Sequence, residues 1–306
     1  MPDLYPLSSL QDHTLNLREK GIFCLVATPI GNLEDLSARA RQVLAQADLI
    51  LCEDTRVTAR LLQHYGITTP TESLHDHNEA HRIPTHISRL HKGMTIALVS
   101  DAGTPVISDP GYRLVRAVIE AELPVTAIPG PNAALMALTL SGFPPHPFLF
   151  MGFPPTRQAA RLSDFSILKA VEQAGLSTTV IWYEAPHRLA ECLGDIAEVF
   201  GSQRPVAIAR ELTKRFEELR RGSAKELADF YAHTPPRGEI VLLMAPNSTP
   251  TVTTQAELDR HILHALTHMS LKDAAAFVAK TLNLPKKTVY TRALELAQNT
   301  PKTELP

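Results

Sequence analysis

Cysteine is scarce in this chain of 306 residues, which has only Cys24, Cys52 and Cys192, far apart and without a CxxC pair. Such an odd, scattered set argues against a disulfide scaffold and a cysteine-based zinc site, and fits a reducing compartment. Long apolar runs are also missing, because the most apolar stretch, residues 125–153, contains five prolines. The first twenty residues lack the apolar core of a signal peptide. We therefore expect a cytoplasmic protein without a membrane span.

Several signatures of common enzyme classes are absent. No GxGxxG follows the first predicted strand, and neither GxxxxGK[ST] nor GxSxG occurs. These absences argue against a dinucleotide fingerprint, a P-loop and a serine-hydrolase elbow. Five histidines do lie within residues 75–91, and Asp76 and Glu79 are adjacent, but no cysteine accompanies them and the stretch is polar enough for a solvated loop and helix. We expect no metal there; an ordinary solvated surface and a polar surface facing the substrate remain open.

The chain also lacks a charge excess of either sign. Thirty basic and thirty-two acidic side chains give a net charge of −2, so no overall cationic field indicates a nucleic-acid binder. The two halves differ, however: residues 1–145 carry 11 basic and 15 acidic side chains, and residues 146–306 carry 19 and 17. Any contact with a polyanion should therefore favour the second half. Two basic clusters lie there, namely Arg204, Arg210, Lys214, Arg215, Arg220, Arg221 and Lys225, and then Lys272, Lys286, Lys287 and Arg292.

What is present is the alternation of an α/β protein. Short β-branched runs alternate with longer helix-like runs, which predicts α/β units around largely parallel sheets. The expected strands are 22–27, 49–52, 95–100, 125–128, 148–151, 179–183, 206–209 and 239–244. Proline-rich segments near residues 143–147 and 245–250 divide the chain. The predicted parts are an extension (1–20), two α/β domains (21–143 and 144–246) and a tail of three short helices (254–298).

Glycine, proline and polar residues are densest just after the predicted strands. Ligands bind at the carboxyl ends of strands in open parallel sheets, so four such loops at one edge favour a binding site over simple turns. The loop sequences, in chain order, are TPIGN, EDTR, SDAGTP and PGPN.

Together, the segments VATPIGNLEDLS, EDTRVTARLL, LVSDAGTPVISDPGYRLV, IPGPNAAL, YEAPHRL and ARELTKRFEE resemble the tetrapyrrole methylase superfamily in order and spacing. They are most similar to its ribosomal-RNA branch, the bacterial 16S rRNA cytidine 2′-O-methyltransferases of the decoding centre. The resemblance covers residues 21–246, and the tail resembles that branch's helix-turn-helix-like extension. It implies two α/β domains around a cofactor cleft, S-adenosylmethionine as cofactor, 16S rRNA in the small ribosomal subunit as partner, and a homodimer.

The resemblance also implies which residues contact the cofactor. The matching positions are Pro29, Asp101, Ala102, Gly103, Val106, Asn132, Ala133 and, more loosely, Tyr183. The sequence departs from the usual pattern at Val106, where glycine is common, and at Asn132 and Ala185, where small hydroxyl residues are common. Asn132 can still cap the helix that follows it. The segment after Phe153 is less basic than the branch pattern, which weakens the expectation for RNA contact there.

Charged side chains near predicted strand ends are the candidates for chemistry. A ribose hydroxyl is a poor nucleophile at neutral pH, so a base or a cation that stabilises the oxyanion would help its methylation. The candidates are Glu53, Arg56, Glu184, His187 and Lys214. Structural ion pairing, for example between Glu211 and Lys214, is the alternative reading.

Two other functions remain open at this point. A methylase of the same superfamily could act on a small tetrapyrrole, although the TPIGN loop and the tail disfavour that reading. A non-catalytic ribosome-assembly factor could use the same scaffold to bind RNA. Cofactor binding without methyl transfer to RNA would distinguish the second alternative.

Overall fold

The computed structural model describes residues 21–247, 255–282 and 284–299, so the predicted extension, residues 1–20, lies outside the described residues. The first sheet has five parallel strands in the order β3-β2-β4-β1-β5. The strands are β1 (Phe23–Val26), β2 (Leu49–Cys52), β3 (Thr71–Ser73), β4 (Ile96–Leu98) and β5 (Val125–Ile128). The predicted strands are therefore confirmed, and the short β3 was not foreseen.

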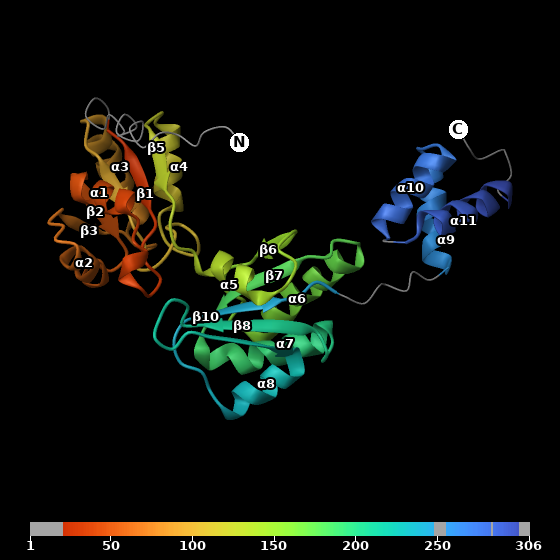
Figure 1. The fold of residues 1–306 in the computed structure, drawn as a ribbon. Helices are drawn as coiled ribbons and strands as arrows, with labels where there is room; N and C mark the ends of the chain where they lie inside the picture. Colours follow the sequence, from red (N-terminus) through yellow and green to blue (C-terminus); the bar gives the residue numbers. More distant parts are fainter. Residues whose placement is uncertain (1–20, 248–254, 283, 300–306) are drawn as a thin grey trace, which may run out of the picture.

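Helices cover both faces of this sheet (Figure 1). Successive side chains of a strand point to opposite faces, so Cys24 and Phe23 of β1 enter two different cores. The core around Cys24 includes residues of α1 and α2, and the core around Phe23 includes residues of α3 and α4. The helices are α1 (Ala38–Gln46), α2 (Thr55–His64), α3 (Glu79–His91) and α4 (Tyr112–Glu120).

The second sheet is mixed, in the order β6-β7-β10-β8-β9. Only β6 and β7 are parallel; β10 runs antiparallel to β7 and β8, and β9 runs antiparallel to β8. The predicted fold class, two α/β domains, is confirmed, but the strand directions in this sheet differ from the expected parallel arrangement. One cause is the short β8–β9 connection, which only an antiparallel pair can use. The strands are β6 (Phe148–Phe150), β7 (Thr179–Glu184), β8 (Pro205–Arg210), β9 (Glu218–Ser223) and β10 (Ile240–Met244).

The helices around the second sheet form two layers (Figure 1). One face packs on α5, through Ala134, Ala137 and Leu138. The other face packs on α6, α7 and α8 around Trp182. Helix α5 precedes the predicted boundary at residue 143. It is apolar on all sides, but only the side that packs on the sheet is buried, whereas Leu135 and Leu140 are exposed. These helices are α5 (Ala133–Ser141), α6 (Gln158–Gln173), α7 (Leu189–Phe200) and α8 (Ala224–His233).

The tail contains the three predicted helices, which pack on one another around Ile262, Val278 and Val289. The Ser270 side chain accepts a hydrogen bond from the Asp273 amide, the N-cap that the Ser-x-x-Asp spacing predicts. The helices are α9 (Gln255–Leu266), α10 (Leu271–Thr281) and α11 (Lys286–Asn299). Within the described residues, none of the helices has the length and apolar character needed to cross a bilayer.

Candidate active site

A cavity of about 380 Å³ lies between loops of the two sheets. Loop residues after β1 and β4 and the start of α5 form one side, and residues of the second sheet and its loops form the other. Ligand pockets typically have volumes in this range, so the cavity can hold a small organic molecule. Its lining includes Ile30, Asp101, Ala102, Gly103, Thr104, Ile107, Ser108, Asp109, Ala133, Phe153, Tyr183, Glu184, Ala185, Pro186, Ala209, Leu212, Gly238, Glu239, Ile240 and Val241.

Three loops of the first domain are tied together at the cavity. Thr28 and Gly103 exchange backbone hydrogen bonds of 2.9 and 3.1 Å, which join the loops after β1 and β4. The Thr104 hydroxyl donates to the Pro131 carbonyl at 3.1 Å, and the Asn132 amide donates to Thr104 at 3.3 Å, which adds the loop after β5. The expectation that these loops meet at one sheet edge is therefore confirmed.

Gly103 is needed at its position for two reasons. Its φ of +83° lies in the left-handed region, where a side chain is strained. A Cβ atom there would also come within 3.3 Å of Ile30, which lines the same cavity. The backbone can therefore approach a ligand closely at this point.

The charged side chains in the cavity lining are all acidic: Asp101, Asp109, Glu184 and Glu239. Burial, together with the nearby carboxylates Glu53 and Asp101, raises the pKa of Asp109 to about 6. Burial also raises the pKa of Asp101, although the Asp54 amide partly offsets this by donating to Asp101 Oδ1 at 3.1 Å. Carboxylates that repel one another in a partly buried site favour a ligand with positive charge.

Glu184 is the most buried of these carboxylates, and its side chain is fully inaccessible. Its Oε1 accepts hydrogen bonds from the Arg188 guanidinium, with Nε at 2.8 Å, and from the Ala185 amide at 2.7 Å. The Cys192 thiol also contacts Glu184, and burial raises the pKa of that thiol. The pair with Arg188 thus fixes the turn after β7, whose residues Glu184–Pro186 form part of the cavity wall.

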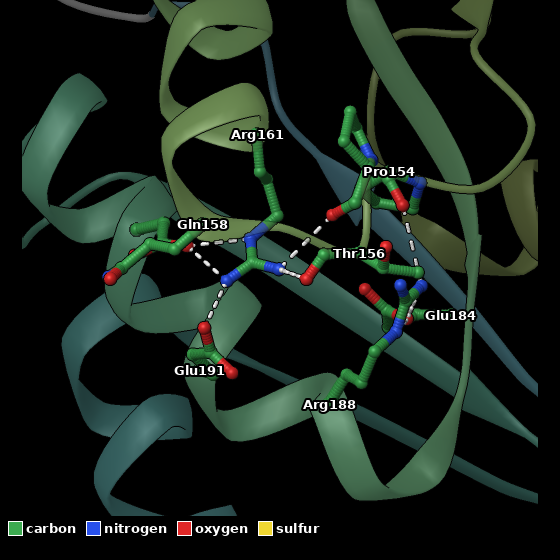
Figure 2. Close-up of polar contacts among 9 residues, drawn as sticks. Pro154, Thr156, Gln158, Arg161, Glu184, Arg188 and Glu191 are labelled. Atoms are coloured by element: carbon green, nitrogen blue, oxygen red, sulfur yellow. Dashed lines mark hydrogen bonds and ion pairs between the residues drawn. The ribbon is translucent and has the colours of Figure 1, made fainter.

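Two arginines hold the segment that carries Phe153 to the cavity (Figure 2). The Arg161 guanidinium is fully buried, contacts Asp195 and Glu191 at 2.6 Å, and donates to the Pro155 carbonyl at 3.2 Å. Arg188 donates to the Pro154 carbonyl at 3.4 Å. Arg161 and Arg188 therefore hold the backbone at Pro154 and Pro155 in place.

The β8–β9 loop links the two domains beside the cavity. The Asn32 amide donates to the Thr213 hydroxyl at 3.0 Å. Gly31 lies so close that an added Cβ atom would come within 2.4 Å of the Lys214 side chain. Lys214 Nζ in turn bonds Glu211 at 2.8 Å and Glu239 at 3.0 Å.

Five of the eight predicted cofactor residues line the cavity: Asp101, Ala102, Gly103, Ala133 and Tyr183. Pro29 instead lines an adjoining cavity of about 170 Å³, which shares Asp101. Asn132 lies outside the lining and caps α5, because its side chain accepts a hydrogen bond from the Leu135 amide at 3.0 Å. Val106 lies in the same loop as Asp101, outside the lining, in a left-handed conformation with φ of +73°. The cofactor contacts themselves stay predictions.

The catalytic candidates are not brought together in one cluster. Glu184 lines the cavity, whereas Glu53, Arg56, His187 and Lys214 lie outside its lining. Glu53 and His187 are exposed, and Arg56 is an exposed partner of Asp54, at 2.6 Å. Lys214 contacts the lining residue Glu239 and has the predicted pairing with Glu211. Their catalytic roles also stay predictions.

Sequence reasoning did not single out most of the other lining residues, among them Asp109, Phe153 and Glu239. Asp109 stands in the motif SDAGTPVISDPG, so its motif offered a signal. Phe153 and Glu239 do not belong to any of the recognised motifs, and only the packing of the two sheets brings them to the cavity.

The histidine segment forms a loop and helix α3. The described residues include no group of three or more histidine, cysteine or acidic side chains placed to hold a metal ion. That no metal takes part stays a prediction. His86, a residue of α3, is buried within the first domain, and burial lowers its pKa.

The comparisons with known proteins agree with this arrangement. Residues 23–228 match the family described as Tetrapyrrole (Corrin/Porphyrin) Methylases, and residues 252–297 match the RsmI C-terminal HTH domain. The chain is 47% identical to "Ribosomal RNA small subunit methyltransferase I" of Mesorhizobium japonicum, over 89% of this chain and 91% of that protein. It is 43% identical to the protein of the same name in Pseudomonas aeruginosa, over 90% and 97%.

Solved structures with a similar fold have much lower identity. Diphthine synthase matches with a TM-score of 0.55 at 12% identity, over 73% of this chain and 89% of that chain. Uroporphyrin-III-C-methyltransferase from Thermus thermophilus matches with a TM-score of 0.51 at 19% identity, over 73% and 94%. At such identities the likeness concerns the fold alone.

Proposed function

The chain belongs to the tetrapyrrole methylase family, and from this premise we propose that it methylates the 2′-hydroxyl of a cytidine in 16S rRNA, with S-adenosylmethionine as the methyl donor. The observation that carries the proposal is the joint match of the methylase region and the tail domain, together with relatives named as small-subunit rRNA methyltransferases. A tail that packs around its own core suits an added RNA-binding unit.

The cavity fits S-adenosylmethionine in size and charge. Its volume of about 380 Å³ suits a ligand of that class, and small residues such as Ala102, Gly103 and Ala133 allow close backbone approach. S-adenosylmethionine carries a positive sulfonium, a positive ammonium and a negative carboxylate group, so it has one net positive charge. Of the four lining carboxylates, Glu184 pairs with Arg188 and Glu239 pairs with Lys214. Asp101 and Asp109 have no basic partner within the described residues, so these two complement the positive charges of the ligand.

S-adenosylmethionine, when bound, supplies the methyl group for an in-line displacement. The contribution of the protein is to orient the ligand and the acceptor hydroxyl and to exclude water. The tied loops at Thr28 and Gly103 hold the cavity wall, and the β8–β9 loop joins the two domains beside it. Two domains held in this way keep the two reacting groups in a fixed relation.

Methyl transfer to the small ribosomal subunit tests the proposal. Purified protein is incubated with tritiated S-adenosylmethionine and, separately, with small subunits lacking the modification, with their naked 16S rRNA and with a porphyrinoid. We expect label in the rRNA of one of the first two substrates. Label confined to the porphyrinoid would indicate a tetrapyrrole methylase, and cofactor binding without any label would indicate a non-catalytic assembly factor.

We further propose that the protein acts in the cytoplasm as a homodimer, as the family resemblance implies. Light scattering during size exclusion should give a mass near twice 33.6 kDa. A mass near 33.6 kDa at working concentrations would contradict the dimer without affecting the proposed reaction.

A further inference from the structure

The basic cluster of residues 204–225 is mostly occupied by contacts within the protein. Arg220 bonds Glu218 at 2.8 Å and lies 4.0 Å from the centre of the Phe230 ring. Arg221 donates to backbone carbonyls at the end of α5. The remaining paired members are Arg204 with Glu172, Arg210 with Glu218, Lys214 with Glu211 and Glu239, and Lys225 with Asp229. Six of the seven basic side chains are therefore engaged by carboxylates or carbonyls.

Arg215 differs from the others. Within the described residues it has neither an ion pair nor a hydrogen bond from its side chain, and its guanidinium lies 5.6 Å from the centre of the Phe216 ring. Phe216 itself is 64% exposed with Arg215 in this position. The exposed ring of Phe216 and the guanidinium of Arg215, which has no ion pair within the described residues, are therefore both accessible to a ligand.

The loop that carries this pair is held firmly from within. Thr213 has a left-handed backbone, with φ of +65°, and its amide donates to the Glu217 carboxylate at 2.7 Å. Backbone bonds join Lys214 to Glu211 and Glu217 to Lys214. Such strain persists only where the surroundings fix it, and it is common at functional sites. The Glu217 carboxylate therefore accepts a hydrogen bond within the loop and does not pair with Arg215.

The base of this loop belongs to the cavity wall, through Leu212. Phe216 follows Leu212 by four positions in the chain, so their Cα atoms lie at most about 14 Å apart. A base that contacts Phe216 would therefore belong to a nucleotide near the one whose ribose reaches the cavity. Sequence-specific RNA contacts usually involve unpaired bases that stack on aromatic rings or arginine planes.

We propose that Phe216 and Arg215 form a stacking platform for an unpaired base of the RNA substrate, which positions the strand for methyl transfer at the cavity. The inference rests on the proposed function, and it names how that function selects its substrate. Phe216 acts here as a positioning residue. Its ring supplies the flat apolar face, and Arg215 adds a positive charge for the phosphates beside that base.

Three substitutions at one position test the platform, with methyl transfer to small subunits measured over a range of subunit concentrations. Phe216→Ala should raise KM for subunits by about 5- to 150-fold, the range expected for one lost base–aromatic stack, with kcat less affected. Phe216→Trp should retain a KM close to that of the wild type. Phe216→Leu keeps apolar area but lacks a flat ring, so it should resemble Phe216→Ala.

Controls separate this platform from other roles. Ile167→Ala removes another exposed apolar side chain, 61% exposed on α6, and should leave KM unchanged. S-adenosylmethionine affinity should be unchanged in every Phe216 variant. Arg215→Ala should reduce the slope of log affinity against log salt concentration by about one unit, the change expected for one lost phosphate contact.

The outcomes distinguish the platform from the proposed function. An unchanged KM in Phe216→Ala, when the wild type methylates subunits, would overturn the platform and leave the function standing. Full activity in Phe216→Leu would indicate apolar docking of a protein and also overturn it. If Phe216→Ala had a lower mass in solution than the wild type, the ring would lie at an interface between copies of this chain, and the platform would be overturned. Absence of methyl transfer by the wild type would refute the function itself.

Discussion

Asp101 and Asp109 lie in one loop, yet their surroundings affect the pKa values of the two carboxyl groups differently. Asp101 accepts the Asp54 amide at 3.1 Å, which favours its ionised form, whereas Asp109 is more strongly affected by burial. Both line the cavity, and a bound cation would favour the charged form of each. The acidic lining is therefore the feature that most directly connects single residues to cofactor binding.

Replacing Asp101 by alanine should weaken S-adenosylmethionine binding by about tenfold or more, since a charged hydrogen-bond partner contributes about 1.5–3 kcal/mol. Calorimetric titration measures the change, and circular dichroism checks that the fold is retained. Asp164→Ala, which removes an exposed carboxylate of α6 outside the lining, is a matched control and should leave the affinity unchanged. Unchanged affinity in a well-folded Asp101→Ala protein would mean that this side chain only supports its loop.

Asp109 predicts how cofactor affinity depends on pH. Its pKa of about 6 is above that of a free aspartate, so the carboxyl is protonated below pH 6 and charged above it. A cationic ligand binds the charged form better, so affinity should rise from pH 5 to pH 7 and then level off. Asp109→Asn should bind more weakly at pH 8 and show a flatter pH profile. The same slope in both proteins would assign the pH dependence to another group, such as Glu53.

At the scale of secondary structure, the segment between β6 and α6 shows how a buried charge network positions a loop (Figure 2). Arg161 lies on α6, and its partners Glu191 and Asp195 lie on α7, so the network joins two helices and the chain at Pro155. Phe153 reaches the cavity wall two residues before Pro155. The network is thus connected to the site through the backbone.

Arg161→Ala should lower the free energy of unfolding by about 3–5 kcal/mol, because it leaves the buried Asp195 carboxylate without its charged partner. Urea denaturation measures the free energy of unfolding. If the variant is only partly soluble, a lower melting temperature shows the loss of stability instead. Arg116→Ala, which breaks an exposed pair with Glu120 on α4, should change stability by less than about 0.5 kcal/mol. Equal effects of the two changes would contradict the assigned role of burial.

In the tail, Lys286 and Lys287 begin α11 and are exposed, whereas Arg292 is held by Asp259 at 2.6 Å and by Glu295. Replacing both lysines by alanine should weaken subunit binding and reduce its salt dependence by about one unit of slope per lost phosphate contact. Cofactor affinity should be unchanged, and stability should vary by no more than about 0.5 kcal/mol. Parallel salt titrations of equal affinity would instead make the tail a packing or dimer element.

The elements that sequence predicted well are those with a strong local pattern. Strands β2 and β5 have the predicted bounds, since each is a short apolar run between turn residues. Strand β9 was missed because its residues, ELRRGS, lack β-branched side chains and include three charges. Its six-residue pairing with β8 forms only in the folded protein. As an edge strand, β9 tolerates charged side chains.

At the scale of the whole molecule, the resemblance carried by loop motifs identified the family and five residues of the cavity wall. It could not supply Glu239 or Phe153, because their place depends on how the second sheet meets the first. The charge distribution along the sequence suggested a basic RNA surface at residues 204–225, where the structure shows mostly internal ion pairs. Charge counts in sequence do not distinguish paired from free side chains, so Arg215 emerges only from the geometry.

The central claim is that a methyl group passes from the cavity to a ribose hydroxyl of 16S rRNA. The most direct measurement is mass spectrometry of nucleosides from rRNA methylated by the protein with deuterated S-adenosylmethionine. The account predicts that the deuterated methyl group appears in 2′-O-methylcytidine and that Asp101→Ala lowers its yield at limiting cofactor. A deuterated methyl group on a nucleobase, or none in rRNA while a porphyrinoid is labelled, would contradict it.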